Sequence, residues 1–243
     1  MYHPFSIAET IKTAWDLFKK NFITIIVYSV IAFLLISVMG IIIGILIPEG
    51  DFYTEMFASF LLLLIQTYST LGLYKLIFTL MDSELYEFEF SQVLPSIKMI
   101  FSYLGVAFII GFCVVTYKIL IVDHLSFSPI AELAANVAGV FIVLYLILRF
   151  MFFNTFVVDD HSGPIESLKQ SFELTRDYML KVLAILGIIV LLIAIPIKVS
   201  QYVPVVSILI LFTYPFVNII LIVTYRKLVY SHQDIDDDVA ETL

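Results

Sequence analysis

The feature that most constrains this chain is a series of six long apolar segments. Each is long enough to cross the hydrocarbon layer of a membrane, which needs about 20 helical residues. A helix satisfies its own backbone hydrogen bonds, so it is the form that such segments adopt in lipid. We therefore expect an all-α fold with six membrane-spanning helices, at residues 22–47, 56–81, 99–122, 133–153, 179–198 and 204–223.

The composition points the same way and excludes several functional classes. Hydrophobic residues make up 61% of the chain and charged residues 14%, about half the charged share of soluble domains. The net charge of -8 excludes a nucleic-acid partner. The single cysteine, Cys113, lies in an apolar segment, so we expect neither a disulfide framework nor a cysteine metal site, and no cofactor.

The positions of the basic residues predict the orientation. If the N-terminus lies in the cytoplasm, only Lys118 and Lys198 of the 13 lysine and arginine residues fall near the outer side. Cytoplasmic loops of membrane proteins carry such an excess of basic residues. We therefore expect both termini to be cytoplasmic, with short outer breaks that close three tight hairpins.

The segment before the first span has the pattern of an amphipathic helix. Within residues 6–21, apolar side chains fall on one helical face and basic ones on the other. Trp15 and Phe18 are the predicted interfacial anchors, because bulky aromatic rings suit the headgroup boundary. We expect this segment to lie along the cytoplasmic surface of the membrane.

A second copy of this pattern precedes the fifth span. Residues 165–174 match residues 8–17 in character at a constant offset, which places Phe172 where Trp15 stands. A weaker third copy runs from Phe90 through Ile100. The interpretation is a single membrane domain, residues 1–228, with repeats at about 6–81, 90–158 and 164–228 and an acidic cytoplasmic tail at 229–243. The alternative is that unrelated amphipathic helices beside spans look alike.

Two stretches carry a resemblance to a known group. They are residues 5–22, and Arg149 with residues 157–160 and 163–176. Here the sequence resembles the bacterial proteins similar to the membrane domain of glycerophosphoryl diester phosphodiesterases, together with their stand-alone relatives. The resemblance implies a six-helix module of the bacterial inner membrane. In the two-part members a separate soluble barrel carries catalysis, and these 243 residues contain no such barrel, so that activity is not expected.

Arg149 is the most informative single residue, because an arginine in an apolar helix costs several kcal/mol unless it is paired or reaches the membrane surface. One interpretation is that its side chain extends to lipid phosphate. The other is an internal ion pair or a site for an anionic headgroup or substrate, together with Lys75 and Lys181 from neighbouring helix ends.

The second span carries a polar stretch at mid-depth that includes Gln66, Ser69 and Thr70. Such groups usually form hydrogen bonds between helices. The alternative is that they line a cavity or contact a substrate there, with Pro215 and Asn218 of the sixth span facing the same space.

No nucleophile, metal or phosphate-binding motif is present in the sequence, so we do not expect an enzyme. The first hypothesis is a non-catalytic inner-membrane protein that acts as an accessory or scaffold subunit, or organises the membrane, with lipids and a membrane-protein partner. The second is a transporter or lipid-handling protein for an anionic or amphipathic substrate. A closed bundle would favour the first, and a groove ending at Arg149 or Gln66 the second.

Overall fold

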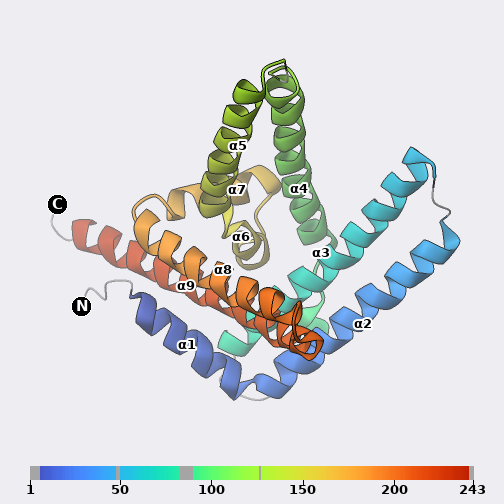
Figure 1. Cartoon of the computed structure of the whole chain (residues 1–243). Coiled ribbons are helices and arrows are strands. Elements are labelled where there is room, and N and C mark those ends of the chain that lie inside the picture. Colours follow the sequence, from blue (N-terminus) through green and yellow to red (C-terminus); the bar gives the residue numbers. More distant parts are fainter. Residues whose placement is uncertain (1–5, 48–49, 83–89, 126, 241–243) are drawn as a thin grey trace.

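The computed structural model describes residues 6–47, 50–82, 90–125 and 127–240, and every regular element in them is helical (Figure 1). The α-helices are α1 (Ile7–Lys20), α2 (Phe22–Leu46), α3 (Phe52–Asp82), α4 (Ile97–Tyr117), α5 (Pro129–Phe150), α6 (Phe153–Asp159), α7 (Pro164–Leu174), α8 (Met179–Ser200) and α9 (Ile208–Ala240). Short 3₁₀ turns span Phe90–Val93 and Pro204–Ser207, and a π-helical turn spans Lys118–Val122.

Within the described residues, six helical segments are long and apolar enough to cross a membrane. They form the hairpins α2/α3, α4/α5 and α8/α9, with α6 extending the second hairpin. The expected all-α, multi-pass membrane fold is therefore confirmed. Helix α9 continues to Ala240, so most of the predicted tail is helical, and residues 241–243 lie outside the described part.

The predicted start of the second repeat differs from the structure for a reason visible in the sequence. Where a third amphipathic helix was expected, the chain forms the 3₁₀ turn Phe90–Val93. Pro95 separates this turn from α4, because the residue before a proline is disfavoured in helical geometry. Ser96 then caps α4 by accepting a hydrogen bond from the Met99 amide at 3.3 Å.

The fourth span is broken between α5 and α6, and α7 bridges the break. The Ser171 hydroxyl donates to the Arg149 carbonyl at 2.8 Å. Its oxygen accepts from the Phe152 amide at 3.2 Å. One buried serine thus satisfies two backbone groups that the interrupted helix leaves without helical partners.

Helix α1 lies along α9 (Figure 1). Glu9 forms an ion pair with Lys227 at 3.0 Å at one end. At the other end the rings of Trp15 and Phe18 pack against Phe216, with centroids 5.6 and 5.5 Å apart. The predicted amphipathic helix is present, and its apolar face covers another helix of the same chain.

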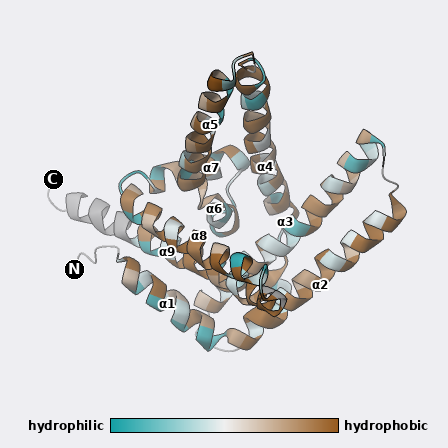
Figure 2. Cartoon of the chain, in the orientation of Figure 1, coloured by the Kyte–Doolittle hydropathy of each residue, from teal (hydrophilic) through white to brown (hydrophobic). Residues whose placement is uncertain are grey.

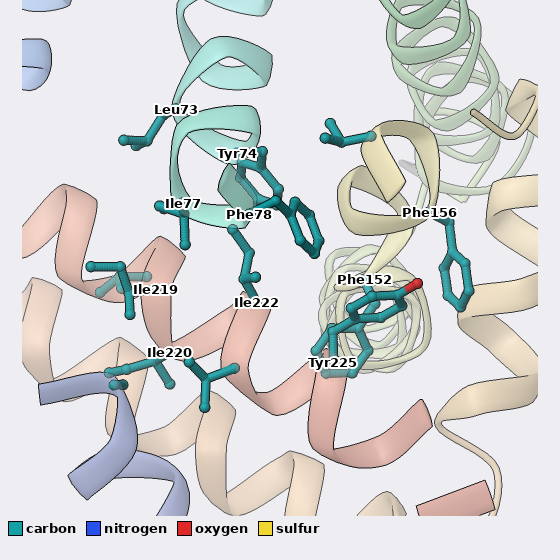
Figure 3. Close-up of a cluster of buried hydrophobic side chains, with 14 of the residues drawn as sticks. Leu73, Tyr74, Ile77, Phe78, Phe152, Phe156, Ile219, Ile220, Ile222 and Tyr225 are labelled. Atoms are coloured by element: carbon teal, nitrogen blue, oxygen red, sulfur yellow. The ribbon is translucent and has the colours of Figure 1, made fainter. Parts of the chain in front are cut away.

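The core lies where α3, α6 and α9 meet, and we call this region the hub (Figure 3). It consists of the buried residues within 71–78, 152–158 and 217–228. Tyr225 packs edge-on against Phe78 and Phe156, with centroids 6.2 and 5.0 Å away. Each of the three hairpins therefore contributes its C-terminal helical segment to one shared core.

A charged junction joins the same three elements at the edge of the hub. Arg226 of α9 contacts Asp82 of α3 at 2.8 Å and Asp159 of α6 at 3.6 Å. The Tyr225 hydroxyl donates to Asp159 at 2.9 Å, and the Arg226 guanidinium lies 5.0 Å from the Phe78 ring. One cation thus connects the ends of all three hairpins.

Beyond the hub the hairpins α2/α3 and α4/α5 point apart (Figure 1). We call their described residues 37–47, 50–65, 107–125 and 127–147, together with residues 190–207, the arms. Their surfaces are hydrophobic over most of their length (Figure 2). Ile45, Phe108 and Ile130 are 77, 75 and 81% exposed. The chain exposes 15270 Å², whereas a compact soluble protein of its mass would expose about 11,000 Å².

Candidate functional site

An apolar groove lies between α2, α3 and the first turns of α9, next to the hub. Its volume is about 560 Å³. Most of its lining is aliphatic and aromatic, and a few polar groups come from all three helices. The residues on which the argument depends are Tyr28, Ala32, Gln66, Ser69, Thr70 and Tyr214.

Close packing of α2 on α3 forms one wall of the groove. The Tyr28 hydroxyl reaches across and donates to the Ser69 carbonyl at 2.9 Å. Gly72 permits this approach, because a Cβ at that position would collide with the Tyr28 hydroxyl. The close packing of this wall therefore depends on Gly72, which lies about one helical turn after the Ser69 carbonyl.

A hydroxyl pair connects α3 to α9 in the groove. The hydroxyl oxygens of Thr70 and Tyr214 lie 3.2 Å apart. Pro215 follows Tyr214 and has no amide hydrogen, so the Leu211 carbonyl lacks its usual helical donor. Asn218 donates to the Tyr214 carbonyl at 2.8 Å, which supports the helix next to the proline.

Ser69 differs from the other hydroxyl residues nearby. Its side chain is 7% exposed, and its hydroxyl has no hydrogen-bond partner among the described residues. Thr67 and Ser29 instead donate to carbonyls of their own helices, at 2.7 and 2.8 Å. A buried hydroxyl without a partner costs about 1–3 kcal/mol. A hydrogen bond between the Ser69 hydroxyl and a bound ligand would therefore be favourable.

The groove has no charge among the described residues that line it, and it lies deep in the helices. None of these residues is acidic, basic or histidine. Gln66 is about 24 Å along α3 from Asp82 and about 21 Å from Phe52, at about 1.5 Å per residue. The polar part of the groove thus lies near the middle of its span.

Arg149 does not line this groove. It is 5% exposed, and its Nη1 donates to the Thr175 hydroxyl at 3.1 Å. The guanidinium lies 3.6 Å from the centroid of the Phe172 ring. Thr175 is the C-cap residue of α7, so the cation is near the negative end of that helix dipole. The side chain is held inside the protein by a hydroxyl and an aromatic ring.

The other two predicted cations have different surroundings. Lys75 donates to the Leu94 carbonyl at 2.8 Å. Lys181 lies 5.8 Å from the Tyr178 ring centroid. Arg149 instead contacts Thr175 and Phe172, so the described contacts give each of the three predicted cations a different partner.

The three predicted interfacial anchors also have different positions. Trp15 is 47% exposed, which leaves half of its surface available to the surroundings. Phe18 is 4% exposed and belongs to the core. Phe172 is 37% exposed and carries the Arg149 guanidinium on its ring. Phe18 is therefore a packing residue in this structure.

Sequence reasoning named Gln66, Ser69 and Thr70 but missed Tyr28 and Tyr214. The available signal was weak: Tyr28 interrupts an otherwise apolar segment, and Tyr214 directly precedes a proline within a helix. Which helices lie side by side is not readable from these patterns. The groove required the structure because its walls come from segments that are distant in sequence.

No group of three or more histidine, cysteine, aspartate or glutamate side chains within residues 6–47, 50–82, 90–125 and 127–240 is arranged to hold a metal ion. The chain was also compared with known proteins. It matches no family model, no curated protein and no solved structure.

Proposed function

We propose that this is a non-catalytic membrane protein that handles lipid, binding an amphipathic molecule in the groove between α2, α3 and α9. The observation that carries the proposal is the groove itself, which has an apolar lining and a small polar part at Gln66, Ser69 and Thr70. A groove at Gln66 was the feature that distinguishes lipid handling from a purely structural role.

The shape and chemistry of the groove support this role. A volume of about 560 Å³ is within the range of ligand sites in proteins, about 300–1,000 Å³. Such sites combine a mostly apolar lining with few polar groups that orient the ligand. The site is a groove and not a closed cavity, so an acyl chain can enter it from the surrounding bilayer.

The proposed location is the bacterial inner membrane, with both termini in the cytoplasm. The distribution of lysine and arginine supports this orientation. It places the charged junction of Asp82, Asp159 and Arg226 at the cytoplasmic side. The resemblance to membrane domains of glycerophosphoryl diester phosphodiesterases remains a prediction, and it is compatible with a protein that works on lipid.

A second candidate is an accessory or scaffold subunit, and the arms favour it. Only 6% of the apolar window of residues 91–122 is buried, against 50% for residues 208–230. A membrane-protein partner could pack along α4 and α5, because their exposed faces are long and continuous. The two candidates differ in what is retained on purification: a lipid in the groove, or a protein along the arms.

Native mass spectrometry tests the proposal. The full chain is extracted from its membrane under mild conditions, and bound lipids and proteins are recorded together. Ala32→Trp places a large ring in the groove. We expect it to lower lipid retention at least tenfold. The matched control is Ala138→Trp, at an exposed position on α5 outside the groove, which should retain the lipid.

Equal lipid retention in the two variants would contradict the groove as the binding site. A stoichiometric protein partner, lost on Ala138→Trp and kept on Ala32→Trp, would instead establish the accessory role. Thermal unfolding of both variants verifies that each is folded.

A further inference from the structure

We infer that the groove selects an uncharged lipid, with a hydroxyl or ester head of the diacylglycerol type, and that the Ser69 hydroxyl binds this head. The inference rests on the proposed function and names the substrate class of the same groove. Three observations carry it: the absence of charge in the lining, the depth of the polar part, and the unmet hydrogen bond of Ser69.

The first step concerns charge. A phosphate or carboxylate in an apolar site needs a nearby cation or several donors to replace its water. The residues that line the groove supply hydroxyls and one carboxamide, and no cation. Lys75, six residues beyond Ser69 along α3, donates to the Leu94 carbonyl. The groove therefore penalises an anionic head.

The second step concerns depth. Gln66, Ser69 and Thr70 lie near the middle of α3, about 18 Å or more along the helix from either end. Charged groups at the bilayer centre are costly, whereas a lone hydroxyl or ester needs only one or two hydrogen bonds there. An uncharged head can therefore sit at this depth, with an acyl chain along the apolar lining of the groove.

The third step identifies the groups that bind the head. Ser69 lines the groove, and its buried hydroxyl has no partner among the described residues, so rotation of this side chain toward the groove lets it donate to an ester carbonyl or accept from an alcohol. Thr70 and Tyr214 form a hydroxyl pair 3.2 Å apart in the same groove, which can extend to a further oxygen. Tyr28 already donates to the Ser69 carbonyl and holds that helix in place.

The test uses the full chain in phosphatidylcholine nanodiscs. Two photoreactive probes with the same acyl chains, a diacylglycerol and a phosphatidic acid, are each crosslinked to the protein, and the labelled peptides are identified. We expect diacylglycerol to label the groove segments of α2, α3 and α9. Unlabelled diacylglycerol should compete for this labelling, and unlabelled phosphatidic acid should not.

Variants then separate the roles of two neighbouring hydroxyl residues of α3. Ser69→Ala should weaken groove labelling by diacylglycerol about two- to tenfold, the range that a single hydrogen bond supports. Thr67→Val is the matched control, because the buried Thr67 hydroxyl is outside the lining of the groove and donates to the Leu63 carbonyl of its own helix. It should leave labelling within about twofold of wild type.

A gain-of-function variant completes the test. Gln66→Lys introduces a cation at an exposed position of the groove, and we expect it to shift the preference toward phosphatidic acid. If phosphatidic acid labels the wild-type groove as well as diacylglycerol does, the inference is overturned and the proposed function stands. If neither probe labels the groove segments, the proposed function fails as well.

Discussion

The hub and the arms are built from the same kinds of apolar residue, yet they differ sharply in packing. In the hub, Ile219, Ile220 and Ile222 of α9 are fully buried (Figure 3). In the arms, isoleucines such as Ile41 and Ile45 are 63 and 77% exposed. Hydrophobicity therefore does not decide which helices of this protein pack together.

The physical reason is the solvent. Lipid is as apolar as the side chains, so burying an isoleucine against another helix gains no hydrophobic free energy in a membrane. Helices there associate through close packing, small residues and polar contacts. The hub has these features: Thr155 and Thr224 are fully buried within it, and Arg226 joins two carboxylates.

The largest expected effect tests packing in the two regions directly. Ile77→Ala removes a fully buried hub side chain, and we expect it to lower the free energy of unfolding by about 2–4 kcal/mol. Ile41→Ala removes an exposed arm side chain and should cost less than about 0.5 kcal/mol. Thermal unfolding in detergent measures both. Similar losses in the two variants would show that the arm side chain is packed as closely as the hub side chain.

An intermediate effect is expected at the charged junction. Arg226→Gln leaves Asp82 and Asp159 without their shared cation. Because the Arg226 side chain is partly exposed, we expect a loss of about 1–3 kcal/mol, below the range for a fully buried pair. Arg176→Gln, at an exposed position, is the control. The rate of protease cleavage within the outer loops should not change, because the junction stabilises the hub.

The smallest effect concerns Asp160, next to the junction. Burial, followed by the charges of Asp159 and Glu166, raises the pKa of this carboxyl above 3.8. The folded protein then binds more protons than the unfolded chain, so stability falls as pH rises from 3.8 to the raised pKa.

Asp160→Asn should remove this decline and stabilise the protein at neutral pH. The carboxyl is largely exposed, so the gain should not exceed about 0.5 kcal/mol. Unfolding curves recorded across that pH window measure the difference in slope. A slope equal to that of wild type would contradict the assignment.

The sequence predicted the spans well because membrane crossing depends on the length and hydrophobicity of single segments. The segment expected at residues 22–47 forms α2, Phe22–Leu46. The interruption after Phe150 was not predicted, because it depends on Ser171, 22 positions from the Arg149 carbonyl that it holds. Local pattern reveals a span, and only distant contacts reveal where it bends.

The candidate site was half predictable for the same reason. Gln66, Ser69 and Thr70 stand out because polar residues are rare in the middle of a span. Their neighbours Tyr28 and Tyr214 lie on α2 and α9, and no local pattern pairs them with α3. Arg149 drew attention as a lone charge, but its partners are a hydroxyl and an aromatic ring, which no charge-based search would select.

The charged junction also has a consequence for how the protein is made. The ribosome synthesises Asp82 and Asp159 before Arg226, and each aspartate ends a different hairpin. The first two hairpins can therefore enter the membrane without being able to complete the ion pairs that join them. Only insertion of the last helix supplies the cation. A chain truncated before α9 thus presents two unneutralised carboxylates, a chemical mark by which incomplete copies differ from finished ones.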